Sequence, residues 1–326
     1  MPVIDVHTHM FTPRWLELLQ SEGGLYNIKT RPDGQQEVFR GDTPVVIPQK
    51  GHFDYEMRIR MMNEAGIDIS IVSLTCPNVY WGNEDTSVRA ARESNDTMAQ
   101  AQTTWPDRIR WFTSLPWEYP ARAVEELERT VQNGASGVMV LANVAGRSLT
   151  DPFFAPIWKA IDDRALPVLV HPTDPPGADL MDMTKFDLSW SVGFMFDTTL
   201  AITRMIFEGF FDQYPNLKLI ASHGGGTLPY LVGRFEKGDE VEIPQRRQMK
   251  RKPTDYLQHI YYDSITYQPG PLQYLLSVVG ADQVMFGTDW PHQVHDVRGS
   301  FANTALLPAK QCQAVRGDNA LRVFGL

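Results

Sequence analysis

The sequence predicts an α/β protein folded as one (β/α)8 TIM barrel with long insertions after strands 1 and 5, and three observations lead to this fold class. Eight short apolar runs alternate with longer amphipathic segments along the 326 residues, a pattern typical of buried parallel strands covered by helices. Histidines follow several of these runs, at the strand ends where such barrels carry their functional side chains. The chain is also long enough for one barrel, which takes about 250 residues, with insertions. No glycine-rich dinucleotide-binding motif follows the first run, which disfavours the alternative, an open doubly wound sheet.

The strands are expected where apolar residues run continuously, because the strands of a parallel sheet are buried on both faces. In chain order they are residues 3–6, 68–74, 109–114, 137–141, 167–170, 217–221, 260–263 and 283–286. Helices are expected where apolar residues recur at spacings of three and four. They are residues 87–104, 121–132, 154–163, 195–213 and 228–236, and Pro116 and Pro215 stand where a helix or loop should stop.

Two connections are too long to be simple turns. They are residues 20–55, after the first strand and a short helical piece, and residues 173–191, after the fifth strand. Both follow the C-terminal ends of strands, so we expect them on the catalytic face as lids or specificity loops. The candidate functional residues extend from position 7 to position 289, so residues 1–326 are expected to form a single domain.

The composition indicates a folded protein, with 43% hydrophobic residues and a formal net charge of -9, and it disfavours nucleic acid as a partner. The one basic cluster, residues 246–252, is expected to be a solvated helix end or loop. The only cysteines, Cys76 and Cys312, are far apart, which is typical of a protein from a reducing compartment. The first residues do not form a signal peptide and no apolar run could span a bilayer, so we expect a cytoplasmic protein without membrane contact.

Four residues at strand ends form a candidate metal site. His7 and His9 end the first strand, and residues i and i+2 of a strand point the same way. His171 ends the fifth strand and Asp289 follows the eighth. Three imidazoles and one carboxylate are a plausible shell for Zn²⁺ with an open position, although Fe²⁺, Co²⁺ and Mn²⁺ accept the same ligands.

His223 ends the sixth strand, directly before three consecutive glycines. It is a candidate second-metal ligand or a general acid or base beside the metal. A second metal usually needs a bridging anion, and strand four ends without lysine, glutamate or aspartate. We therefore expect one divalent ion per chain, with His223 free to move a proton.

These motifs carry a resemblance that extends along nearly the whole chain. The chain resembles the amidohydrolase superfamily, and within it the amidohydrolase-related branch of non-oxidative decarboxylases that includes 2-amino-3-carboxymuconate-6-semialdehyde decarboxylase. The matching segments are residues 5–9, 170–172, 222–226, 233–234 and 287–291, together with Trp190 and the run to residue 202.

The resemblance implies a role for each matched residue. It implies Zn²⁺ on His7, His9, His171 and Asp289, proton handling by His223, and a pocket wall at Trp190. It also implies a homodimer in which Arg234 reaches a substrate carboxylate across the interface. The expected reaction is removal of CO2 from an unsaturated or aromatic carboxylic acid. The alternative is hydrolysis of a lactone, ester or amide, or a hydration, with His223 or Asp289 as the base that activates metal-bound water.

The first insertion departs from the family pattern. Family members carry an arginine in this insertion, shortly before the helix that contains Arg58 in this chain. At the same distance before Arg58 this chain has Val46, and Arg40 or Lys50 could replace the arginine through a shifted loop. Asn78 and Trp290 follow strand ends and are further candidates for substrate contact. The remaining side chains with candidate polar roles are expected to be ordinary loop or salt-bridged surface residues, namely His52, His259, His292, His295, Arg58 and Arg60.

Overall fold

Eight parallel strands form the central sheet, in the order β1, β5, β6, β7, β10, β11, β12, β13. The structure is a computed structural model, and it describes residues 1–183, 185–241 and 248–326. The strand bounds are β1 Ile4–His9, β5 Ile69–Ser73, β6 Ile109–Ser114, β7 Gly137–Leu141, β10 Pro167–His171, β11 Lys218–Ala221, β12 Tyr261–Asp263 and β13 Val284–Met285. Each strand overlaps one of the eight predicted apolar runs, and their side chains are almost entirely buried, so the predicted barrel is confirmed.

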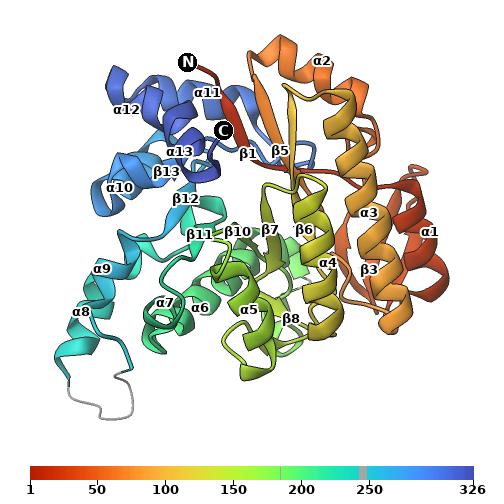
Figure 1. Cartoon of the computed structure of the whole chain (residues 1–326), viewed down its shortest axis with the longest axis horizontal. Coiled ribbons are helices and arrows are strands. Elements are labelled where there is room, and N and C mark those ends of the chain that lie inside the picture. Colours follow the sequence, from red (N-terminus) through yellow and green to blue (C-terminus); the bar gives the residue numbers. More distant parts are fainter. Residues whose placement is uncertain (184, 242–247) are drawn as a thin grey trace.

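Hydrogen bonds between the first and last strands bring the two edges of the sheet together. The Val6 amide donates to the Phe286 carbonyl at 3.0 Å, and the Asp289 amide donates to the His7 carbonyl at 2.9 Å. This contact brings the residues after β13 next to the residues that end β1, although about 280 positions separate them in sequence. Figure 1 shows the strands at the centre of the molecule, with the two termini near each other beside β1.

Helices surround the sheet. Their bounds are α1 Pro13–Glu22, α2 Tyr55–Ala65, α3 Glu84–Thr104, α4 Pro120–Gln132, α5 Ala155–Asp162, α6 Phe194–Phe207, α7 Phe210–Gln213, α8 Val232–Glu240, α9 Pro253–Leu257, α10 Pro269–Val279, α11 Val297–Ala305, α12 Ala309–Gln313 and α13 Asn319–Phe324. Figure 1 shows α3, α4 and α5 following one another along the outside of the barrel.

The predicted helix over residues 195–213 is in fact two helices, α6 and α7. Gly209 separates them with a φ of 67°, a backbone conformation that side-chain-bearing residues rarely adopt. A Cβ atom at this position would also lie 2.5 Å from the Gln248 carbonyl oxygen. The apolar spacing continues through the break, so periodicity alone could not reveal it.

The first insertion is more ordered than the sequence indicates. After the end of α1 it contains a three-stranded antiparallel sheet, in the order β2–β3–β4, formed by Tyr26–Thr30, Gln36–Arg40 and Thr43–Val46. We call this sheet the flap. Most residues of β2 and β3 are half-buried or exposed, and polar residues interrupt their apolar ones, so these two strands lack the apolar run that marks the barrel strands. β4 is mostly apolar but only four residues long. The second insertion consists of short helical turns at Ala178–Met181, Lys185–Asp187 and Ser189–Gly193, which lead into α6. Separately, a hairpin of two short strands follows β7, and these strands are β8 Asn143–Val144 and β9 Arg147–Ser148.

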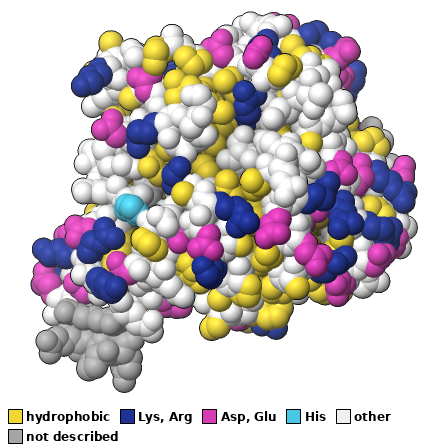
Figure 2. All heavy atoms as spheres, in the orientation of Figure 1, with side chains coloured by type: hydrophobic (Ala, Val, Ile, Leu, Met, Phe, Trp, Pro, Cys, Tyr) yellow, Lys and Arg dark blue, Asp and Glu magenta, His cyan; other side chains and the backbone are white. Residues whose placement is uncertain are grey.

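Charges of both signs are mixed over the surface. Figure 2 shows Lys and Arg side chains interspersed with Asp and Glu over α3 and α4, where Arg129 lies 2.6 Å from Asp96 and Arg89 lies 2.6 Å from Glu22. Of the predicted basic cluster, residues 246 and 247 lie outside the described part of the chain. None of the described helices combines the length and the apolar character needed to cross a membrane.

Candidate metal centre and active site

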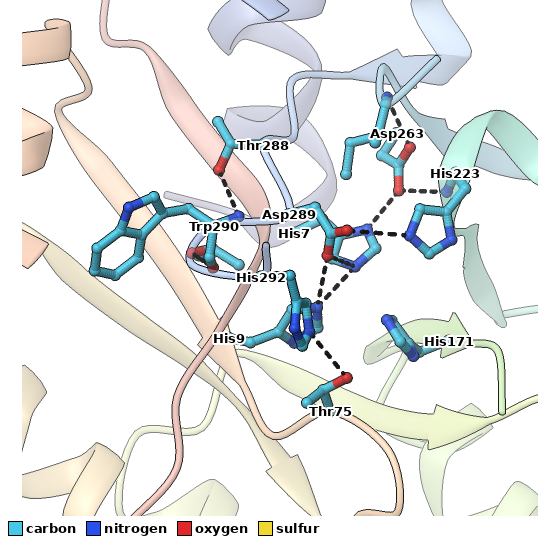
Figure 3. Close-up of polar contacts among 12 residues, drawn as sticks. His7, His9, Thr75, His171, His223, Asp263, Thr288, Asp289, Trp290 and His292 are labelled. Carbon is cyan, nitrogen blue, oxygen red and sulfur yellow. Dashed lines mark hydrogen bonds and ion pairs between the residues drawn. The ribbon is translucent and has the colours of Figure 1, made fainter. Parts of the chain in front are cut away.

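His7 and His9 lie at the C-terminal end of β1, and both are completely buried. Strand alternation directs their side chains to the same side of the sheet, as predicted. Their Nε2 atoms lie 3.0 Å apart, and Figure 3 shows both rings directed toward the carboxylate of Asp289. β1 therefore presents two imidazole nitrogens to one point at the mouth of the barrel.

The other ring nitrogen of each histidine is bonded to the protein. His7 Nδ1 is 2.6 Å from Asp263 Oδ2, His9 Nδ1 is 3.2 Å from the Leu74 carbonyl, and His171 Nδ1 is 2.8 Å from the Pro172 carbonyl. Carbonyl and carboxylate oxygens only accept hydrogen bonds, so each Nδ1 carries the hydrogen and each Nε2 has a free lone pair. Metal-binding histidines in proteins are oriented in this way.

Asp289 completes the cluster from the loop after β13. Its Oδ1 lies 3.2 Å from His9 Nε2 and 3.6 Å from His7 Nε2. Thr288 holds this loop by donating from Oγ1 to Asp5 Oδ2 at 2.6 Å, and Asp289 itself has a φ of 60°. His171, at the end of β10, has its ring centroid 4.9 Å from that of His9 and 5.2 Å from that of His7.

These four residues fit a divalent cation. The lone pairs of His7 Nε2 and His9 Nε2 would repel at 3.0 Å unless a positive charge lay between them. His171 Nε2 and Asp289 Oδ1 are buried and have no hydrogen-bond partner in the described part of the chain, a state that is costly for polar atoms without a ligand. Three imidazoles and a carboxylate form the donor set expected for Zn²⁺ or a similar ion.

The protonation states of His9, His171 and Asp289 also suit metal binding, which requires neutral imidazoles and an ionised carboxylate. Burial lowers the pKa of His9 to about 3 and that of His171 well below its usual value. Burial opposes a charge on Asp289, but His292, His223 and His9 hold the pKa of that carboxyl well below its usual value.

His223 follows β11 and stands beside the cluster. Its Nε2 is 3.7 Å from Asp289 Oδ2, and its Nδ1 is buried without a hydrogen-bond partner among the described residues. His223 has a φ of 53°, and the three glycines after it also have positive φ values. At Gly226 a Cβ atom would lie 2.5 Å from the Met195 carbonyl oxygen, so the turn that presents His223 requires glycine there. The ligand atoms of His7, His171, His223 and Asp289 lie within 4.8 Å of one another, so His223 can reach a proton acceptor bound at this point.

Asp263, at the end of β12, organises both His7 and His223, and sequence reasoning missed it. It is completely buried. Its Oδ2 accepts from His7 Nδ1 and from the His223 amide at 2.8 Å, and its Oδ1 accepts from the Gly224 amide at 2.9 Å. Burial would lower the pKa of His7, but the hydrogen bond to Asp263 and its charge raise it above the usual value, which makes this imidazole a stronger ligand. The available signal was an aspartate that ends the seventh predicted strand.

A cavity of about 570 Å³ opens over the cluster. Trp190 lines it, together with His171, His223 and Asp289. The flap contributes a further wall. Other parts of the lining come from the second insertion, the start of α6 and the loops after β5, β12 and β13. The two predicted insertions therefore both border the site.

A different arginine of the first insertion lines the cavity in place of the family arginine that this chain lacks. Val46 lines the cavity, whereas Arg40 borders a separate hollow and Lys50 is exposed. Neither predicted substitute lines the cavity, because the flap turns Arg40 to the other side. Arg31 lines it instead, from the turn between β2 and β3, where its amide donates to the Gln35 carbonyl.

Three further candidates lie away from the cavity lining. Asn78 is completely buried, and its carbonyl accepts from Trp15 Nε1 and Trp81 Nε1. Trp290 is buried, and in Figure 3 its ring points away from the histidines. Arg234 is exposed on α8.

Arg58 was expected on a salt-bridged surface, and that prediction is wrong. It is completely buried, donates from Nη1 to Thr8 Oγ1 and from Nη2 to the His9 carbonyl, both at 2.5 Å, and lies 4.5 Å from the Trp290 ring centroid. Its charge therefore lies directly behind the candidate metal ligands of β1. Its neighbour Arg60 is exposed and 3.8 Å from Glu56, as predicted.

His292 also has a larger role than predicted. It lines the cavity, its ring centroid is 4.8 Å from that of His9, and its Nε2 lies 3.3 Å from Thr75 Oγ1. His52, expected in a loop, is completely buried behind it at a centroid distance of 4.9 Å. Both histidines were expected to be ordinary loop residues, and the sequence pattern did not indicate that His292 contacts His9 or that His52 contacts His292.

A barrel with this histidine and aspartate cluster at its mouth defines a metal-dependent enzyme. Residues 4–326 match the amidohydrolase family Amidohydro_2, and the chain belongs to this family. It is 28% identical to 2-amino-3-carboxymuconate-6-semialdehyde decarboxylase of Dictyostelium discoideum, over 99% of this chain and 91% of that protein. It is 30% identical to gamma-resorcylate decarboxylase of Polaromonas sp., over 83% of this chain and 87% of that protein.

A solved structure shares the fold of this chain. A dihydroxybenzoic acid decarboxylase from Polaromonas sp., with bound manganese and 2-nitroresorcinol, superimposes with a TM-score of 0.82 at 24% identity, over all of this chain and 97% of that one. The family, the barrel and the decarboxylase class predicted from the sequence are thus confirmed.

Proposed function

We propose that this chain is a non-oxidative decarboxylase of an aromatic or conjugated carboxylic acid, dependent on one divalent metal ion. The observation that carries the proposal is the convergence of His7 Nε2 and His9 Nε2 with Asp289 Oδ1, at 3.0–3.6 Å, beside His171 and His223. His7, His9, His171 and Asp289 would hold the ion. When bound, the ion supplies Lewis-acid stabilisation of negative charge on a substrate oxygen.

His223 is the proposed proton donor. Its imidazole lines the cavity and is not locked by a hydrogen bond at Nδ1 to any described residue. It delivers a proton to the ring carbon that bears the carboxylate, which becomes tetrahedral. The bond to the carboxylate then breaks, its electron pair returns to the ring, and CO2 leaves, so the carboxylate anion and one proton become the decarboxylated product and CO2. Asp263 fixes the His223 backbone during this step.

We infer Zn²⁺ as the ion, because imidazole-rich sites with one carboxylate suit it. Mn²⁺ suits the same ligands and is the ion of the Polaromonas neighbour. Metal analysis of purified protein should find about one ion per chain, and two ions would contradict the mononuclear centre.

We further propose a cytoplasmic homodimer. Both cysteines are free, as in a reducing compartment. The second insertion exposes large apolar side chains, including Leu180, Phe186 and Trp190, which favours a covered surface. In this dimer Arg234 would reach the carboxylate in the partner's cavity. An Arg234→Ala variant should remain dimeric in light scattering while its KM rises, and a monomeric wild-type protein would contradict the dimer.

CO2 release from a panel of hydroxybenzoates and conjugated semialdehyde acids tests the function directly. The wild-type enzyme should release CO2 from at least one class, and His223→Asn should abolish release while retaining one ion per chain. His295→Asn, which alters an exposed histidine outside the cavity lining, is the matched control. Hydrolysis of lactones or amides without CO2 release would instead establish the hydrolase alternative.

A further inference from the structure

The charges that line the cavity restrict which acids it can hold. Among the described lining residues, Arg31 is the one Lys or Arg side chain. The lining carboxylates are Glu37, Asp187 and Asp289, and Asp289 belongs to the metal cluster. Arg234 of a second subunit is proposed above to hold the carboxylate that lies at the metal cluster. A second anionic group on a substrate would therefore depend on Arg31 for a charged partner.

Arg31 is already paired with protein carboxylates. Its Nη1 lies 3.3 Å from Glu37 Oε2, and its Nε lies 3.8 Å from Asp33 Oδ2. The Glu37 side chain is only 13% exposed and lines the cavity itself. A substrate carboxylate at this end would meet a cation that is neutralised and a carboxylate that repels it.

The flap strand beside this pair offers no replacement. Pro44, Val45 and Val46 of β4, followed by Ile47, line the cavity with apolar side chains. Phe194 and Met195 of α6 also line it. A carboxylate against these side chains would lose its hydration without gaining a hydrogen bond, which is strongly unfavourable.

We propose that the cavity selects acids with a single carboxylate and an uncharged ring, and that the Arg31–Glu37 pair excludes substrates with a second carboxylate. The one carboxylate lies at the metal cluster beside His223, and the uncharged part of the ring packs against β4. This substrate class rests on the decarboxylation proposed above, but the selectivity is a property of the cavity and can be measured without turnover.

Matched acids test the selectivity. The metal-loaded full chain is assayed for CO2 release from 2-hydroxybenzoate and from 4-hydroxyisophthalate, and for binding of unreactive benzoate and isophthalate by calorimetry. We expect the monocarboxylate of each pair to be favoured by on the order of 100-fold, because an unpartnered carboxylate opposes binding. Equal or tighter binding of isophthalate would overturn the proposal. If no acid releases CO2 but benzoate is favoured over isophthalate, the selectivity holds and the decarboxylase function fails.

A variant isolates the ion pair. Glu37→Gln removes the repelling carboxylate and the closer of the two carboxylate partners of Arg31. The preference for benzoate over isophthalate should therefore shrink by about tenfold, the size of one charge-assisted hydrogen bond. Asp42→Asn is the matched control, because Asp42 pairs with Lys29 on the same flap, is fully exposed and is not among the lining residues. An unchanged preference in Glu37→Gln would show that the ion pair does not set the selectivity.

Discussion

Replacing Asp263 by asparagine tests how the barrel holds the candidate centre. The change keeps the shape of the side chain but removes its charge and one acceptor oxygen. Four donors converge on the two carboxylate oxygens: His7 Nδ1 and the His223 amide on Oδ2, and the Gly224 and Ile265 amides on Oδ1. Whichever way the amide of asparagine lies, its NH2 group faces two of these donors.

The expected magnitude follows from those contacts. Each buried donor left without an acceptor costs about 1–3 kcal/mol, so the free energy of unfolding of the metal-free protein should fall by about 2–6 kcal/mol. His7 also loses the charged acceptor that keeps its lone pair on Nε2, and loss of such a partner weakens metal binding about 10–100-fold. Both effects arise at one buried residue that is not itself a proposed ligand.

Urea unfolding of the metal-free protein and calorimetric titration with Zn²⁺ and Mn²⁺ measure the two quantities separately. Asp282→Asn serves as the control, because Asp282 is an exposed aspartate just before β13. An Asp263→Asn variant with wild-type stability and wild-type metal affinity would refute the reasoning.

Three further outcomes are expected. Arg58→Met removes a buried cation and its hydrogen bonds to Thr8 and the His9 carbonyl, so urea unfolding should show a loss of about 2–4 kcal/mol, against less than about 0.5 kcal/mol for the exposed control Arg60→Met. Burial raises the pKa of Asp197 to about 7 from its usual 3.8, so the folded state holds this proton more tightly than the unfolded state does. The free energy of unfolding should therefore fall as pH rises from about 4 to about 7, by at most about 1.4 kcal/mol per pH unit. The Asp197→Asn variant should lack this pH-dependent contribution. Chelation of the ion should lower the melting temperature and abolish CO2 release, and readdition of Zn²⁺ or Mn²⁺ should restore both, since an ion that binds only the folded state stabilises it; a melting temperature unchanged by chelation would contradict the proposed centre.

The barrel strands and the candidate ligands were predictable because both depend on local patterns. Continuous apolar runs mark strands that are buried on both faces. The alternation of β1 directs His7 and His9 to the same side without any knowledge of the rest of the fold. The flap was not predictable in this way, because its strands are largely polar and half-exposed.

Charged residues were the least predictable part of the site. Arg58 and Arg60 occupy the same helix two positions apart, yet Arg58 is buried behind His9 and Arg60 is exposed. The helical pattern of α2 assigns neither position, because the contacts of Arg58 come from β1, about 50 residues earlier. Arg31 likewise became a cavity residue only through the antiparallel pairing of the flap.

The sequence by itself determined the alternation of strands and helices, the barrel, the family and the four candidate metal ligands, because strand periodicity and short motifs act over a few residues. The tertiary structure alone decided which groups support those ligands. Asp263 bonds to His7 across 256 positions, and the Asp289 loop meets β1 across about 280. Such contacts form only when the sheet closes into a barrel, because closure brings the first and last strands, and the side chains at their ends, within hydrogen-bonding distance.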